Sequence, residues 1–251
     1  MKWAAISFRA TTLALLLVLL FRPEWLAFLL APLAGDGRPF VYNQNSLPQL
    51  ALAHLGLVVL SISAGGLVAV LAGIFVTRPS GSDFLPLSRA VANAGQTFPP
   101  VAVLALAVPA TGFGATPTLI ALFFYGLLPI FENTIAGLQQ VPEKAVEAGV
   151  GMGMSPLQRL WQVELPLAAP LIIEGLKVAT VINIGTATIG STVAAKGLGE
   201  VIIAGLISDN TAFILQGGLI VGLLAMLVYD AIGILTGFLA HSNSVRVPNS
   251  I

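Results

Sequence analysis

The stretch EAGVGMGMSPLQRLWQVELP, residues 147–166, lies between two long apolar runs. The run before it covers residues 115–138 and the run after it covers residues 167–193. A membrane-spanning helix needs about 20 apolar residues, and both runs reach that length. The stretch itself is rich in glycine, carries several charges and contains Pro156. We therefore interpret it as a loop between two membrane spans.

Composition excludes a soluble globular protein. Of the 251 residues, 57% are hydrophobic and 9% are charged, whereas an ordinary soluble domain carries about 25% charged residues. The net charge of +0 gives no indication of a nucleic-acid partner. We expect the lipid bilayer to surround most of the chain.

The chain lacks the residue patterns of catalysis and of nucleotide binding. It has no cysteine, which excludes disulfides, thiolate metal sites and cysteine nucleophiles. His54 and His241 are too far apart to form a local metal motif. No phosphate-binding loop, nucleophile elbow or zinc-protease motif is present. We expect no catalytic residue, no metal site and no cofactor in this chain, so any ATP that it uses must be bound by another chain.

The apolar runs predict an all-α, polytopic membrane protein with about six transmembrane helices. A polar interruption around Pro23 makes residues 25–34 an expected interfacial piece. A cleaved signal peptide is the alternative for the first run, because Lys2 and Arg9 precede a short apolar core. The expected spans are residues 4–21, 50–76, 85–109, 115–138, 167–193 and 212–239.

Lysine and arginine placement predicts the orientation, because cytoplasmic loops hold the excess of these residues. With the N-terminus inside, the outer loops contain Arg22, Arg38 and Lys196. The cytoplasmic segments and their margins contain Lys2, Arg9, Arg78, Arg89, Lys144, Arg159 and Arg246. This asymmetry predicts that both termini and the loop at residues 139–166 are cytoplasmic.

Small residues spaced four apart recur within the expected spans. Such spacing lets two helix backbones approach closely. We favour packing within one subunit over a dimer face for these pairs, which are Ser61 with Gly65, Gly218 with Gly222, and Gly233 with Gly237.

Residues 139–166 predict two short helices joined by glycines. Pro142 suits the first turn of the first helix. We expect that helix to fail where glycines permit a left-handed or closely packed backbone, at Gly149, Gly151 and Gly153.

A capping pattern predicts the start of the second helix. Ser155 can cap it, Pro156 fits its first position, and Gln158 completes a capping box. An apolar stripe at helical spacing follows, formed by Leu157, Leu160 and Trp161.

This element resembles the EAA signature of ATP-binding cassette (ABC) importer permeases. In that signature Glu-Ala-Ala is followed by three residues, a Gly, nine residues and then Ile-x-Leu-Pro. The matching positions are Glu147, Ala148, Gly149, Gly153, Val163, Leu165 and Pro166, with Gly149 in place of the second Ala and Val163 in place of Ile. The alternative is a tight loop with an incidental apolar stripe.

The resemblance implies that the loop holds a coupling helix. Such a helix sits in a groove on the ATP-binding subunit and passes its closing motion to the membrane helices, and the glycine break lets it lie across the membrane plane. The residues implied for ATPase coupling are Glu147, Ala148, Gly149, Gly153, Ser155, Leu157, Trp161, Leu165 and Pro166.

The same resemblance implies a type I ABC importer permease fold in a bacterial cytoplasmic (inner) membrane. The implied partners are two ATP-binding cassette ATPase subunits that use ATP and Mg, an extracytoplasmic substrate-binding protein and a second permease subunit. The expected domains are an N-terminal segment and outer loop at 1–46, the permease domain at 47–240 with its coupling loop at 139–166, and a cytoplasmic tail at 241–251.

Three further segments of the sequence resemble the osmoprotectant branch of these permeases, and the likeness covers roughly residues 47–240. They are VANAGQTFPPVAVLALAV, LLPIFENTIAGLQQVPEKAVEAGVGMGMS and LKVATVINIGTATIGSTVAAKGLGEVI. This branch implies glycine betaine, choline or carnitine as the substrate. The alternatives are an importer of an amino acid or another small solute and, more remotely, an ion-coupled secondary transporter or a channel.

Polar residues within the spans are candidates for the translocation path, since a polar group in hydrocarbon is costly unless it faces a cavity or a partner. The candidates in the fifth span are Asn183, Thr186, Thr188 and Ser191. The alternative is that they bond across helices or to their own backbone. The charges in or next to the spans are Glu132, Glu174, Lys177 and Asp230. We favour charges that snorkel or pair near the cytoplasmic interface over a gate or ion-coupling role.

Aromatic residues within the spans give no clear cage for a quaternary ammonium group, which such cages hold by cation–π attraction. The candidates are Phe123, Phe124, Tyr125 and Tyr229, and residues of this kind more often serve packing. We therefore expect a separate binding protein to provide most of the substrate selection.

Overall fold

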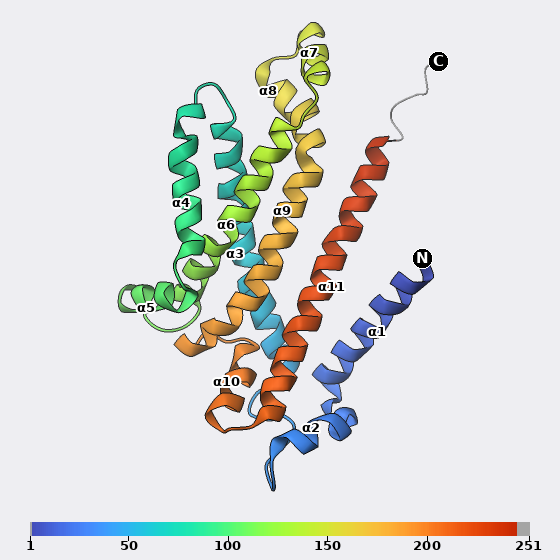
Figure 1. Ribbon diagram of the computed structural model, residues 1–251, viewed down its shortest axis with the longest axis vertical. Coiled ribbons are helices and arrows are strands. Elements are labelled where there is room, and N and C mark those ends of the chain that lie inside the picture. The colour runs from blue at the N-terminus through green and yellow to red at the C-terminus, as the bar shows by residue number, and fades with distance from the viewer. Residues whose placement is uncertain (1, 245–251) are drawn as a thin grey trace.

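The structure, a computed structural model, describes the backbone of residues 2–244 and the side chains of residues 6–234, 236 and 237. Every regular element in this part of the chain is helical, and the long helices form a bundle with short helices at both ends (Figure 1). Helices satisfy their own backbone hydrogen bonds, as a span in lipid requires. In chain order the elements are α1 (Lys2–Phe21), η1 (Pro23–Leu26), α2 (Ala27–Ala34), α3 (Leu47–Val76), η2 (Ser82–Phe84), α4 (Leu85–Thr97), α5 (Pro100–Thr111), α6 (Ala115–Gln139), α7 (Glu143–Gly151), α8 (Pro156–Arg159), η3 (Leu160–Glu164), α9 (Leu165–Thr186), η4 (Ala187–Val193), α10 (Gly199–Ile207) and α11 (Thr211–Ser244).

Helices α3, α6 and α9 form the centre of the bundle, with α6 packed against both of the others. Glycines allow this close approach. A Cβ added at Gly73 of α3 would lie 2.7 Å from Thr134 Cγ2 on α6. One added at Gly175 of α9 would lie 2.8 Å from the Pro129 carbonyl oxygen on α6. Because lipid gives no hydrophobic reason for helices to associate, such tight packing stabilises the bundle.

The number of spans agrees with the sequence. Among the described residues, 4 helices are long and apolar enough to cross a membrane, or up to 6 if each of two bent helix pairs counts as one span. One bent pair joins Ile6–Phe21 to Pro23–Ala34 at 110°, where we expected a first span followed by an interfacial piece. The chain is therefore a multi-pass membrane protein.

The expected continuous span at residues 85–109 is wrong. The second bent pair joins Ser82–Thr97 to Pro100–Thr111 at 95°, and α5 points away from the bundle direction (Figure 1). Phe98 between them has an extended backbone with φ −75° and ψ 133°. A proline disfavours helical backbone at the preceding residue, so Pro99 ends α4.

The small-residue pairs behave in two ways. Ser61 and Gly65 are buried, and a Cβ added at Gly65 would lie 3.3 Å from the Phe123 carbonyl oxygen on α6. Packing within one subunit is therefore correct for that pair. On α11, Gly218 and Gly222 are exposed, and an added Cβ would meet nothing within 4 Å. Our prediction of packing within one subunit is wrong for this second pair.

The loops gather at two ends of the bundle. Figure 1 shows α7 and α8 at one end, with α2 and α10 toward the other. Helix α11 packs against α9 and α10, and α1 lies on α11 (Figure 1). The expected tail at residues 241–251 overlaps the end of α11, and Arg246 lies outside the described residues.

Candidate functional site

The turn between α7 and α8 is held by a glycine and a capping box. Gly153 has φ +77°, a left-handed conformation that glycine adopts at little cost. The backbone N–H of Gln158 donates to Ser155 Oγ at 3.3 Å, and the backbone N–H of Ser155 donates to Gln158 Oε1 at 2.8 Å. The capping box predicted from the sequence is therefore present.

The glycine break is shorter than we expected. Helix α7 continues through Gly149 and ends at Gly151, so the expectation that it fails at Gly149 is wrong. Gly149 is buried beneath the α8 side of the loop, and an added Cβ would lie 3.5 Å from both Arg159 Cγ and Met154 Sδ. A glycine inside a helix costs about 1 kcal/mol relative to alanine, and the 3.5 Å contacts at Gly149 would accept a methyl group.

The second short helix is the beginning of a longer one. Helix α8 passes into the five-residue π-helix η3 and then into α9, so Pro156–Val193 forms one helical run of 38 residues. Single π turns inside α-helices occur frequently at functional sites. The predicted separate element lying across the membrane plane is therefore wrong for α8, which is joined directly to a central membrane helix.

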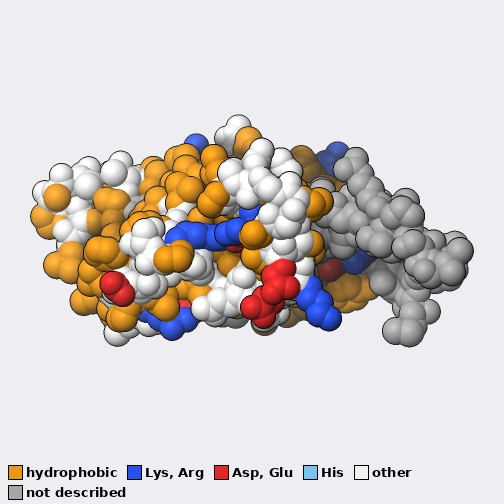
Figure 2. Space-filling model, turned by 90° about the horizontal axis from the view of Figure 1, so that it is seen from above, with side chains coloured by type: hydrophobic (Ala, Val, Ile, Leu, Met, Phe, Trp, Pro, Cys, Tyr) orange, Lys and Arg blue, Asp and Glu red, His pale blue; other side chains and the backbone are white. Residues whose placement is uncertain are grey.

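The loop exposes large apolar side chains at its end of the bundle. Leu157 and Trp161 are each 64% exposed, and Val150 and Met152 of the α7 side are exposed as well. Figure 2 shows this end of the molecule, where hydrophobic side chains and a few charged ones share the surface. Leu160, the third member of the predicted stripe, instead packs partly buried against the core of the bundle. Of the predicted apolar stripe, Leu160 thus faces the bundle, and Leu157 and Trp161 face outward.

The remaining motif residues lie on both sides of this loop. Glu147 and Ala148 are exposed on α7, and Pro166 is exposed at the start of α9. Val163 and Leu165 are partly buried, and Leu165 packs in the same cluster as Leu160. The motif spacing therefore places some side chains outward and uses others to fasten the loop.

A buried carboxylate at the unspecified position within the motif was missed by sequence reasoning. Glu164 is 6% exposed. Its Oε1 accepts a hydrogen bond from Arg159 Nε at 3.1 Å, and its Oε2 lies 2.5 Å from a terminal nitrogen of Arg78. The only sequence signal was an acidic residue between the apolar positions Val163 and Leu165.

The four charges expected near the spans are all paired. Lys177 Nζ donates to Glu174 Oε2 at 2.7 Å, which suits their spacing of three along α9. Arg89 of α4 donates two hydrogen bonds to Glu132 at 2.9 and 3.0 Å. Arg9 of α1 donates to Asp230 Oδ2 at 3.2 Å. Two of the three pairs therefore join different helices.

Asn183 lies at the contact of three helices. Its Nδ2 donates to Ser61 Oγ on α3 at 3.2 Å and to the Leu122 carbonyl on α6 at 2.9 Å, and the side chain is fully buried. Among the other path candidates, Thr188 donates to the Gly185 carbonyl at 2.7 Å and Ser191 to the Ala195 carbonyl at 3.1 Å. Thr186 is partly buried. In this conformation Asn183 binds helices together, and the path role of these residues remains a prediction.

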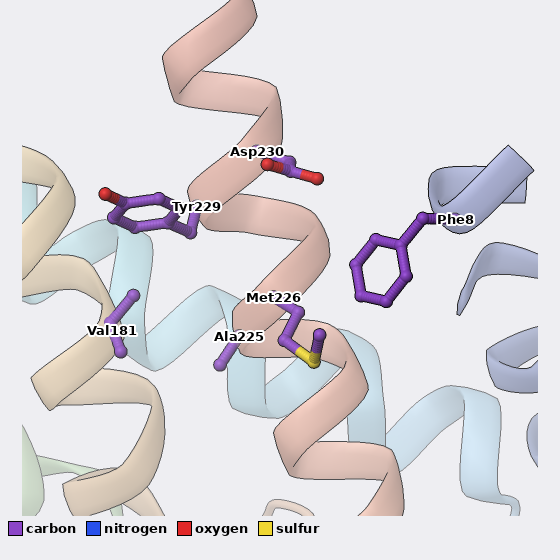
Figure 3. A pocket seen from close by; sticks show the side chains of 6 residues that line it. All are labelled: Phe8, Val181, Ala225, Met226, Tyr229 and Asp230. Carbon is purple, nitrogen blue, oxygen red and sulfur yellow. The ribbon is translucent and has the colours of Figure 1, made fainter. Parts of the chain in front are cut away.

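A pocket of about 240 Å³ lies among α1, α9 and α11 (Figure 3). Figure 3 shows Tyr229 directed toward α9 and Asp230 directed toward the side of Phe8. Neither polar group is free, because Lys177 Nζ lies 4.1 Å from the Tyr229 ring centroid and Asp230 binds Arg9. Lys177 thus already lies over one face of the Tyr229 ring, and the Asp230 carboxylate is already paired.

Comparison with known proteins identifies relatives over most of the chain. The osmoprotectant import permease protein OsmY of Salmonella typhimurium is 40% identical over 186 residues, which cover 74% of this chain and 79% of the relative. The choline transport system permease protein OpuBB of Bacillus subtilis is 37% identical over 186 residues, covering 74% and 85% of the two chains.

Solved structures support the same architecture. A chain of the MetNI methionine ABC transporter in inward-facing conformations matches with a TM-score of 0.69 and 21% identity, over 77% of this chain and 95% of that one. At this identity the match shows the fold, which is that of type I ABC importer permeases. The family model of the binding-protein-dependent transport system inner membrane component matches residues 65–242. The loop geometry, the fold and these matches together show that the chain belongs to the family of binding-protein-dependent transport system inner membrane components.

Proposed function

We propose that this chain is the non-catalytic permease subunit of an ATP-driven importer that moves quaternary-ammonium osmoprotectants, such as glycine betaine, into the bacterial cell. The observation that carries the proposal is the loop at residues 139–166. It combines the EAA spacing with an exposed apolar pair, Leu157 and Trp161, on a turn held by Gly153 and Ser155. We assign this loop as the docking surface for a partner ATPase.

The continuity of the loop with α9 supports a role in energy coupling. A displacement of the Trp161 side chain acts directly on a helical run that reaches Val193. The partner ATPase would bind and hydrolyse ATP with Mg, while this chain supplies the path together with a second permease subunit. In this proposal residues 47–240 form the transport domain in the inner membrane, and both termini are cytoplasmic.

Selection of the solute is assigned to an extracytoplasmic binding protein. The named relatives transport osmoprotectants or choline, which supports the quaternary-ammonium class. In the pocket beside Tyr229, Lys177 already lies over one face of the ring, so a cationic solute would meet a positive charge there. A permease that receives its solute from a selective partner needs only weak contacts along the path.

Uptake of labelled glycine betaine tests the proposal. Membrane vesicles carry this chain with its candidate ATPase and binding protein, and wild type is compared with Trp161→Ala and with the control Trp25→Ala. Trp25 is 71% exposed and lies in η1, directly before α2, which Figure 1 shows toward the other end of the bundle. We expect ATP-dependent uptake in wild type and in the control. Because truncation of an aromatic anchor at an interface costs about 2 kcal/mol or more, we expect Trp161→Ala to lower ATPase co-purification and uptake at least about tenfold.

Three results would contradict parts of this proposal. Uptake that does not depend on ATP would contradict an ABC importer. ATP-dependent uptake of another solute, without uptake of glycine betaine, would keep the importer and remove the substrate. Equal ATPase binding by wild type and Trp161→Ala would remove the docking role of that side chain.

A further inference from the structure

Glu164 occupies an unusual place for an acidic residue. Among the described residues, the buried charged side chains are Glu164 and Lys177. Removing a carboxylate from water costs several kcal/mol unless opposite charges and hydrogen bonds compensate it. Here Arg78 and Arg159 supply that compensation from two sides, at 2.5 and 3.1 Å. The three side chains form one cluster, which we call the arginine–glutamate joint.

The joint connects the coupling loop to a different part of the bundle. Arg159 is the last residue of α8, and Glu164 is the last residue of η3. Arg78 lies two residues after the end of α3, in the short connection that leads through η2 to α4. The Glu164 carboxylate therefore joins the loop to the α3–α4 connection, which the sequence places far away.

The joint also reaches the EAA motif itself. The Arg159 side chain lies over Gly149, since an added Cβ there would be 3.5 Å from Arg159 Cγ. Gly149 of α7, Arg159, Glu164 and Arg78 are thus linked in sequence by a contact, a hydrogen bond and an ion pair. Leu160 and Leu165 pack against the same buried apolar cluster as Val70 and Ile74 of α3. This shared cluster adds an apolar connection between the loop and α3.

We propose that the arginine–glutamate joint positions α3 and α4 relative to the coupling loop, so that ATPase closure moves these helices as well as α9. Glu164 and Arg78 are positioning residues in this role, because they act through the helices that they join. The inference rests on the proposed function, since it assigns a second route for the same motion. Without the joint, the loop drives α9 alone and ATP hydrolysis is uncoupled from transport.

The test compares Glu164→Gln, Arg78→Gln, the double variant and the control Asp83→Asn with wild type. Asp83 is an exposed acid in the same α3–α4 connection. Each chain is reconstituted with its ATPase and binding protein, and uptake of glycine betaine and ATP hydrolysis are measured on the same vesicles. We expect both single variants to keep ATPase binding and hydrolysis while uptake falls about tenfold, a size typical of coupling between sites. The double variant should be no worse than either single one, because both remove the same link.

A second readout does not depend on the substrate. The chain has no native cysteine, so a single cysteine at Ser88 of α4 reports on that helix through its rate of thiol labelling. We expect ATP to change this rate in wild type and in Asp83→Asn, and to leave it unchanged in Glu164→Gln and Arg78→Gln. If wild type shows the ATP-dependent change without glycine betaine uptake, and both joint variants lose that change, the proposed substrate is contradicted and the joint is supported.

Two outcomes would overturn the inference. In one, uptake, hydrolysis and assembly of the Glu164→Gln complex fall in proportion, which indicates a purely structural role. In the other, both single variants keep the wild-type amount of ATP hydrolysed per solute and the ATP-dependent labelling at Ser88.

Discussion

Gly149 and Gly153 differ in the backbone conformation that each adopts. Gly149 lies within α7 and has room for a methyl group at ordinary contact distance, 3.5 Å from its nearest neighbours. Gly153 has open space around it but a φ of +77°. Space alone would favour alanine more at Gly153 than at Gly149. Backbone conformation predicts the reverse, because only Gly153 has a positive φ.

We expect Gly149→Ala to be as stable as wild type or more stable, because alanine is favoured in a helix by up to about 1 kcal/mol. Gly153→Ala should destabilise the loop by roughly 1 kcal/mol, because an L-residue is strained in the left-handed region. The thermal unfolding midpoint of the purified chain in detergent measures both, with ATPase co-purification as a second readout. A destabilised Gly149→Ala or an unaffected Gly153→Ala would contradict this account.

The residue pattern of the motif predicted the loop, but it did not predict the ion pair that holds the loop against the rest of the bundle. The capping box of Ser155 and Gln158 was readable because both partners lie within one turn. The Glu164 ion pair with Arg78 was not predictable, because it joins η3 to the connection after α3, and helix packing brings these two segments together. Local hydrogen bonding can be predicted from spacing, whereas contacts between helices require the fold.

Among the elements, the central contact of α3, α6 and α9 depends on Asn183. Its amide links Ser61 and the Leu122 carbonyl across two helix boundaries. We expect Asn183→Ala to lower stability by about 0.6 kcal/mol or somewhat more, the average found for polar contacts between membrane helices. Unfolding of the solubilised chain measures this effect, and Thr192→Ala is the control, since Thr192 is exposed and bonds only its own helix.

The same variant also tests the path prediction for Asn183. A side chain that holds helices together should leave solute selectivity unchanged when it is removed from an assembled complex. Altered competition between glycine betaine and choline in Asn183→Ala, at unchanged stability, would instead favour a place on the path.

Most spans were predictable because each is a long apolar run with a proline or polar residue at its boundary. The expected span at 50–76 corresponds to α3 (Leu47–Val76), and that at 115–138 corresponds to α6 (Ala115–Gln139). Residues 85–109 were misjudged because hydropathy continues across the bend at Phe98. The pair Pro99 and Pro100 carried the signal for that bend, since a proline restricts the residue before it.

At the scale of the whole molecule, orientation follows from the positive-inside rule. We expect the α3–α4 connection to be cytoplasmic and the turn between α10 and α11 to be extracytoplasmic. Ser80 and Ser208 are exposed residues in these two places, and the chain has no native cysteine. A membrane-impermeant maleimide should label Ser208→Cys in cells with a permeabilised outer membrane, and Ser80→Cys only after the inner membrane is opened. The reverse pattern would invert the topology.

The π-helix at Leu160–Glu164 affects the direction in which the preceding side chains of α8 face. A π turn holds one residue more than the hydrogen-bonded turn of an α-helix, so it is equivalent to a one-residue insertion. Each residue turns an α-helix by about 100°. Loss of a single residue here would rotate Leu157 by that angle relative to α9 and leave both flanking helices intact. The length of this one turn therefore sets the direction in which Leu157 faces relative to α9.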